Sequence, residues 1–214
     1  MKNDLRVVVF DASQLWRRPL GLGFSWRVGS TLYRGFAGVD ASFGARSWDE
    51  ALGWLGRVQP ERRIAELQYW GHGNWGRALI ARRSFDRSVL APGHALYPGI
   101  EALRARLAPG ARIRFRTCET LGAQTGHDFA AALSDFTGAT VAGHTFEIAF
   151  FQSGLRALAP GARPNWSPTE GLLRGTADAP QRSRASHPRE PNTITCLTTA
   201  LPLELALGSA QHLE

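Results

Sequence analysis

Short apolar runs alternate along much of the chain with segments whose apolar positions recur at helical spacing. The apolar runs predict buried strands at 5–10, 64–70, 111–117 and 139–144. The helical spacing predicts helices at 47–58, 98–107 and 125–138. This alternation predicts an α/β fold, with a mainly parallel sheet, right-handed crossovers and flanking helices.

Local signals mark where the expected helices begin and end. Ser47 with Glu50 three positions later forms a capping box for the first helix. Pro98 is suited to the first turn of the second helix. Thr125 is the expected N-cap of the third helix, and Gly138 is its expected C-cap.

The chain divides by composition into a domain and a C-terminal extension. We expect one α/β domain over 1–174, which includes a weaker strand or hairpin near 25–36 and a short strand at 78–82. Residues 175–191 are rich in Ala, Pro, Ser and Arg, which is typical of an exposed linker. Residues 192–212 contain a strand-like run that we expect to dock back onto the same domain.

Composition narrows the possible classes of protein. A length of 214 residues and an apolar fraction of 43% suffice for a substantial core. The two cysteines stand in unlike contexts, which favours a reducing compartment over a disulfide framework. No apolar run reaches the length of a signal-peptide core or a membrane span, so we expect a cytoplasmic protein with no membrane partner.

The charge pattern does not favour a nucleic-acid partner. The formal net charge is +7, but the basic residues are arginines scattered along the chain, with Lys2 as the only lysine. Nucleic-acid-binding proteins usually gather basic residues on one face. The sequence does not indicate the oligomeric state.

Two expected strand ends carry the residues of a thiol site. His72 follows the strand at 64–70, and Cys118 follows the strand at 111–117. Imidazole is a suitable base for a thiol, and a spacing of 46 residues is close to the roughly 50 of caspase-type peptidases. Strand parity puts both side chains on the side of Glu66 and of an arginine ladder.

That ladder consists of Arg112, Arg114 and Arg116, which share one face of the expected strand. On adjacent parallel strands, Glu66 would lie beside one of these arginines. Asp11 and His144 also stand at strand C-termini, the edge where active sites of parallel sheets lie.

Each candidate also has a purely structural interpretation. Cys118 can be an inert core thiol, and His72 can be a satisfied turn residue. Cys196 lies in a Thr-rich apolar run with no histidine beside it and is expected to be structural. A zinc site formed by His72, Cys118 and His144 is disfavoured because no two ligands are closely spaced, so no metal is expected.

A hydrophobic strand ending in His-Gly, followed by a hydrophobic strand ending just before Cys, resembles the caspase-like (clan CD) cysteine peptidases. Residues 64–171 look most like a bacterial domain of unknown function in that superfamily. The shared segments are GHGNWG at 71–76, TCETLG at 117–122 and TGATVAGHT at 137–145, with Trp166 and Glu170-Gly171 further on.

The resemblance implies a caspase-like fold and a cysteine endopeptidase that acts on a protein or peptide without a cofactor. His72 and Cys118 would form the dyad, and the Gly73 N–H would belong to the oxyanion hole. Asp11, Arg116 and His144 would contribute to substrate binding. Arg116 replaces the acidic residue typical of basic-specific members, and the caspase signature is absent. The alternative is a catalytically inactive caspase-like module that binds a protein partner.

Overall fold

The computed structural model describes residues 4–13 and 38–207 of the chain. The strand or hairpin expected near 25–36 lies outside the described residues. Within them, the order of elements alternates between strands and helices up to residue 144, as the sequence predicts.

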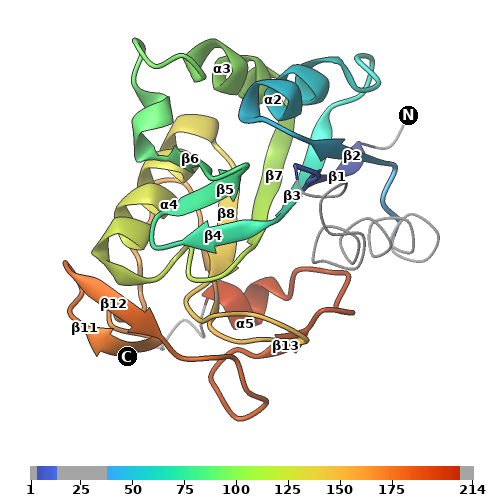
Figure 1. Cartoon of the computed structure of the whole chain (residues 1–214). Helices are drawn as coiled ribbons and strands as arrows, with labels where there is room; N and C mark the ends of the chain where they lie inside the picture. The colour runs from blue at the N-terminus through green and yellow to red at the C-terminus, as the bar shows by residue number, and fades with distance from the viewer. Residues whose placement is uncertain (1–3, 14–37, 208–214) are drawn as a thin grey trace.

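A six-stranded, mainly parallel sheet forms the centre of the molecule (Figure 1). Its strands lie side by side in the order β10-β8-β7-β3-β1-β2. Only β10 runs antiparallel, against β8. The strands comprise β1 (Leu5–Asp11), β2 (Ala41–Ala45), β3 (Ile64–Trp70), β7 (Leu107–Arg116), β8 (Thr140–His144) and β10 (Leu155–Leu158). The predicted α/β class is confirmed, and the topology is consistent with a caspase-like fold.

Three helices pack on one face of this sheet. They are α2 (Trp48–Arg57), α3 (Tyr97–Arg106) and α4 (Ala123–Thr137). Their apolar residues join one buried cluster with every second residue of the central strands, such as Leu67 and Ile113. Burial of this shared apolar surface is the main stabilising contribution to the fold.

The opposite face of the same strands carries polar side chains. The Arg6 Nε lies 3.0 Å from Glu66 Oε2, and Arg112 Nη2 lies 4.0 Å from the same oxygen. Gln68 Nε2 donates to Glu66 Oε1 over 2.7 Å, and Trp70 Nε1 donates to Gln68 Oε1 over 3.0 Å. The three helices avoid this face, on which Arg112 is partly exposed while Arg114 and Arg116 are buried.

The local signals at the helix ends are confirmed in part. Ser47 Oγ accepts a hydrogen bond from Glu50 N, and the Glu50 carboxylate reaches back to Arg46 N. Gly138 is the left-handed C-cap of α4, with φ of 69°. The prediction of Thr125 as the N-cap was wrong. The helix begins at Ala123, and its N-cap is Gly122, which has no side chain to accept a hydrogen bond from the first turn.

A second small sheet follows β3 directly. It consists of β4 (His72–Asn74), β5 (Arg77–Ile80) and β6 (Arg83–Asp86), all antiparallel, and leads into the short 3-10 helix η1 (Arg87–Leu90). This meander lies across the ends of β3 and β7 (Figure 1).

The described residues after β8 also form two antiparallel strand pairs and a short helix. The first pair is β11 (Leu172–Gly175) with β12 (Pro180–Ser183), so the segment expected as an exposed linker contains a strand. The second pair is β9 (Phe151–Gln152) with β13 (Ile194–Thr195). The helix is α5 (Leu203–Leu207). Ile194 and Leu201 pack against apolar residues of β8 and β10, so this segment covers part of the polar face.

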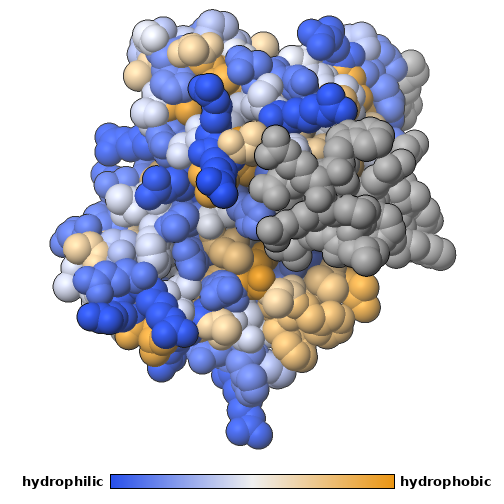
Figure 2. Space-filling model, viewed as in Figure 1, coloured by the Kyte–Doolittle hydropathy of each residue, from blue (hydrophilic) through white to orange (hydrophobic). Residues whose placement is uncertain are grey.

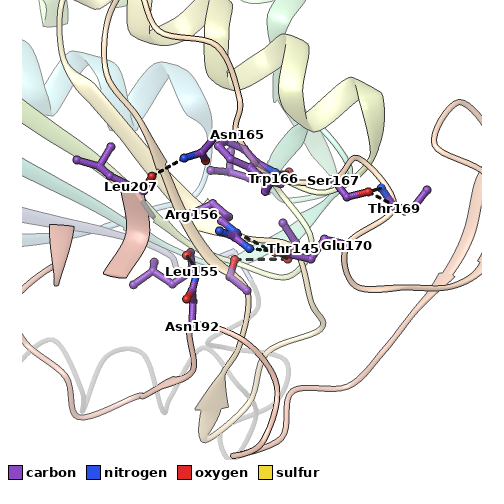
Figure 3. A network of polar contacts seen from close by, with 12 residues as sticks. Thr145, Leu155, Arg156, Asn165, Trp166, Ser167, Thr169, Glu170, Asn192 and Leu207 are labelled. Carbon is purple, nitrogen blue, oxygen red and sulfur yellow. Dashed lines mark hydrogen bonds and ion pairs between the residues drawn. The ribbon is translucent and has the colours of Figure 1, made fainter. Parts of the chain in front are cut away.

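A partly buried ion pair joins the segment after β10 to the sheet (Figure 3). Arg156 on β10 binds the Glu170 carboxylate through its Nε at 3.0 Å and through Nη2. Thr145 Oγ1 donates to Glu170 Oε1 over 2.8 Å. Trp166 Nε1 donates to the carbonyl oxygen of Leu121. Residues that carried the family resemblance, such as Trp166 and Glu170, therefore hold the fold together.

Candidate functional site

The two candidate residues leave the sheet from adjacent, registered positions. Strands β3 and β7 are parallel neighbours in which Glu66 pairs with Arg112 and Trp70 pairs with Arg116. His72 and Cys118 each follow the last pair by two residues. The predicted adjacency of these strands, with Glu66 beside an arginine of the ladder, is confirmed.

His72 begins the small sheet rather than ending in an open loop. It is the first residue of β4 and pairs with Leu79 of β5. The imidazole is exposed. The backbone of His72 is held between the end of β3 and the β4–β5 hairpin, while the residue is exposed to solvent.

Gly73 packs directly against the Cys118 turn. A Cβ on Gly73 would lie 2.5 Å from Thr120 Oγ1, 2.6 Å from Cys118 O and 2.7 Å from Thr117 Cβ. Side-chain carbons do not approach other atoms so closely, and only glycine fits at this position. The two motifs that the sequence places 46 residues apart are therefore in contact.

The Cys118 turn is held by threonine hydroxyls and a strained residue. Thr120 Oγ1 lies 3.2 Å from Cys118 O and 3.4 Å from Arg77 O, and it also contacts the Thr117 hydroxyl. Glu119 adopts a left-handed backbone conformation with φ of 58°. Such conformations are costly for residues other than glycine and gather at functional turns.

The Cys118 thiol is half-buried and faces the backbone of Ile148, in the segment between β8 and β9. Ile148 N donates to Cys118 Sγ over 3.4 Å, and Sγ lies 3.8 Å from Ile148 O. Arg116, two residues before Cys118, contacts Gln152 of β9, which follows Ile148 closely in sequence. Cys118 thus keeps the face of the arginine ladder, as strand parity predicts.

The surroundings of Cys118 disfavour its thiolate. Burial is the main cause that raises the pKa of the thiol to about 11; the Glu119 and Glu147 carboxylates act in the same direction, and the hydrogen bond from Ile148 N opposes them. Burial also raises the pKa of Glu119, opposed by the hydrogen bond from Ser183. At neutral pH the resting thiol is neutral, with a thiolate fraction on the order of 10⁻⁴.

Arg116 is fully engaged inside the protein. Its guanidinium donates to Gln152 Oε1 through Nη2 over 3.1 Å and to the carbonyl oxygen of Cys196 over 2.7 Å. It also lies over the Trp70 ring, 5.1 Å from the centroid. These contacts tie the C-terminal segment to the end of β7.

His144 is completely buried at the end of β8. Its Nδ1 lies 3.0 Å from the carbonyl oxygen of Ser153, while Nε2 has no hydrogen-bond partner. Burial, together with the nearby Arg114 and Arg116 guanidinium groups, lowers the pKa of His144 to about 3, and the hydrogen bond to Ser153 opposes this shift. The ring is therefore neutral and donates its Nδ1 proton to Ser153.

Asp11 is also withdrawn from the surface. Its side chain is 5% exposed, and Oδ1 accepts a hydrogen bond from Ser13 N over 2.8 Å. Together with Arg116 at 6% and His144 at 0% exposure, it lies inside the protein. This burial weighs against direct contact of the three side chains with a substrate.

Sequence reasoning missed the residues that close the site around Cys118. Ile148 contributes only backbone atoms, so no residue type could signal it. Thr120 and Glu119 stand in the TCETLG segment, but their roles depend on the turn conformation. Within 4–13 and 38–207, no group of three or more His, Cys, Asp or Glu residues is arranged to hold a metal ion. None of the helices described is long and apolar enough to cross a membrane.

Comparison of the chain with protein-family models, with curated proteins and with solved structures gave no significant match.

Proposed function

We propose that this chain is a caspase-like cysteine endopeptidase in which His72 and Cys118 form the dyad. The observation that carries the proposal is the contact between Gly73 and the Cys118 turn, at the registered ends of β3 and β7. It brings an exposed imidazole and a half-buried thiol to one edge of a parallel sheet, where active sites of such sheets lie.

The high pKa of the resting thiol constrains the chemistry. A neutral thiol attacks only if its proton is removed during the attack, so His72 acts as a general base. Cys118 Sγ bonds to the substrate carbonyl carbon, and the Gly73 N–H stabilises the oxyanion that forms. The imidazolium then protonates the departing amine. Water, deprotonated by His72, releases the acid from the thioester and regenerates the thiol.

A second function is favoured by one specific observation. The pKa of about 11 for Cys118, with Glu119 and Glu147 both raising it, is the reverse of the lowered pKa typical of catalytic cysteines. A caspase-like module that binds a protein partner without cleaving it accounts for this environment. Its Cys118 would be a structural thiol held by Ile148.

A mechanism-based label separates the two functions. Peptidyl chloromethyl ketones with a basic, an acidic or an apolar residue beside the reactive group are incubated with the folded protein at pH 7. Intact-mass and peptide analysis locate the adduct. The peptidase gives one adduct at Cys118 that is lost in His72→Ala and kept in the control His94→Ala.

The binding module gives no adduct at Cys118, or the same slow labelling in wild type and His72→Ala. Either result would leave the peptidase without support.

A further inference from the structure

Charged residues that face one another across the strands of this fold carry opposite charges in almost every described pair. Arg6 and Arg112 flank Glu66 in the central sheet, and Arg77 is paired in register with Asp86 in the small sheet. Opposite charges at such positions stabilise a sheet, and like charges directly opposite destabilise it.

The hairpin of β11 and β12 is the exception among the register pairs described. Arg174 pairs directly with Arg182, and both side chains are exposed. Residues paired directly in a regular ladder have Cβ atoms roughly 5 Å apart, and here the register shifts on both sides of Arg174. This pair of like charges stabilises the hairpin less than a pair of opposite charges would.

No carboxylate in the described part of the chain neutralises this pair. Asp178 lies in the turn of the hairpin but forms an ion pair with neither arginine. The neighbouring Arg184 has a partner, because its Nη1 lies 3.6 Å from Glu190 Oε1. Among the described residues, the opposed arginines therefore present to solvent two positive charges that no carboxylate neutralises.

The hairpin is held rigidly enough to present that pair in a fixed geometry. Gln124 N, in the first turn of α4, donates to Ala177 O over 3.0 Å, and Arg184 N donates to Gly171 O over 2.8 Å. Within the turn, Ala179 N donates to Thr176 Oγ1 over 3.1 Å. A rigid scaffold reduces the entropy lost when a partner binds.

We propose that the β11–β12 hairpin is a docking surface for an acidic segment of a partner protein, with Arg174 and Arg182 binding its carboxylates. Hydrophilic side chains gather over this hairpin in Figure 2. Guanidinium groups bind carboxylates through paired, charge-assisted hydrogen bonds. Leu173, next to Arg174 in β11, is 56% exposed.

A protein partner fits this hairpin better than a nucleic acid. Strands β11 and β12 carry no aromatic residue on which a base could stack, and the arginine pair spans only one register position. The surface is separate from the His72/Cys118 pair, so the inference does not depend on catalytic activity.

The test measures binding and not cleavage. Fluorescence anisotropy at low ionic strength follows a fluorescein-labelled peptide of alternating Glu and Leu, and separately an oligothymidylate of equal charge. We expect the double variant Arg174→Gln/Arg182→Gln to bind the peptide about tenfold more weakly than wild type. The matched control Arg82→Gln/Arg83→Gln removes two exposed charges near the β5–β6 turn and is expected to change affinity less than about twofold.

A charge-reversal variant distinguishes a direct loss of peptide binding from a loss of folding. Arg174→Glu creates a matched cross-strand pair with Arg182, so it should unfold at no lower urea concentration than wild type and still lose the peptide. Equal weakening by both double variants, unchanged binding by Arg174→Glu, or tighter binding of wild type to the oligothymidylate than to the peptide would each overturn the proposal.

Discussion

Replacing Gly73 with alanine tests the contact on which the proposed site depends. The new Cβ would lie 2.6 Å from Cys118 O and 2.7 Å from Thr117 Cβ, in addition to 2.5 Å from Thr120 Oγ1. The Cys118 carbonyl belongs to the backbone and cannot rotate away as a side chain can. The β4 segment and the Cys118 turn must therefore move apart. Overpacking of this kind costs about 1–3 kcal/mol.

Urea and thermal unfolding measure this loss. For a chain of this length, about 1–3 kcal/mol corresponds to a fall in Tm of roughly 2–12 °C. Gly56→Ala is the matched control, because a Cβ on Gly56 would meet nothing within 4 Å and the residue lies in α2. Alanine is the better helix former, so that control should gain up to about 1 kcal/mol.

The two substitutions therefore have opposite expected signs. If Gly73→Ala unfolds within about 0.5 kcal/mol of wild type, the His72 segment does not rest on the Cys118 turn as described, and the argument for a dyad loses its structural basis.

Two further predictions concern titratable groups. Glu119→Gln removes a carboxylate that raises the Cys118 pKa, so iodoacetamide at pH 9 should alkylate Cys118 about threefold faster than in wild type, by peptide mass spectrometry; an unchanged rate would show that Glu119 does not act on the thiol. His144 has a pKa lowered from 6.5 to about 3, so its contribution to the free energy of unfolding is present above pH 6.5 and is lost as pH falls toward 3. His144→Gln should flatten that acid limb in urea titrations, and an equally steep limb would contradict the burial of a neutral ring.

Much of the fold was predictable because it depends on local pattern. The strand around Val7 follows from a short apolar run, and the strand around Ile113 alternates apolar and basic residues with the period of a strand. Segments with apolar positions at helical spacing follow these strands in sequence. That Glu66 lies beside an arginine of the ladder followed from parity and charge, although which arginine did not. The proximity holds because a buried carboxylate needs a cation beside it.

The site was less predictable because its details arise from long-range contacts. That Cys118 faces the backbone of Ile148 depends on how the segment after β8 folds back, which no residue type encodes. The interior roles of Arg116 and His144 depend on Gln152, Cys196 and Ser153, all from the C-terminal part of the chain. Sequence position at a strand end indicates an active-site edge, but it does not indicate which side chains turn inward.

The most direct test of the proposed peptidase is cleavage of a proteome-derived peptide library, read by mass spectrometry of the new termini. Wild type, Cys118→Ala, His72→Ala and the control Cys196→Ala are compared at pH 7–8. The account predicts a consistent set of cleavage sites with wild type and Cys196→Ala, and loss of those sites with Cys118→Ala and His72→Ala. Cleavage that persists in Cys118→Ala, or no cleavage by wild type, would contradict it.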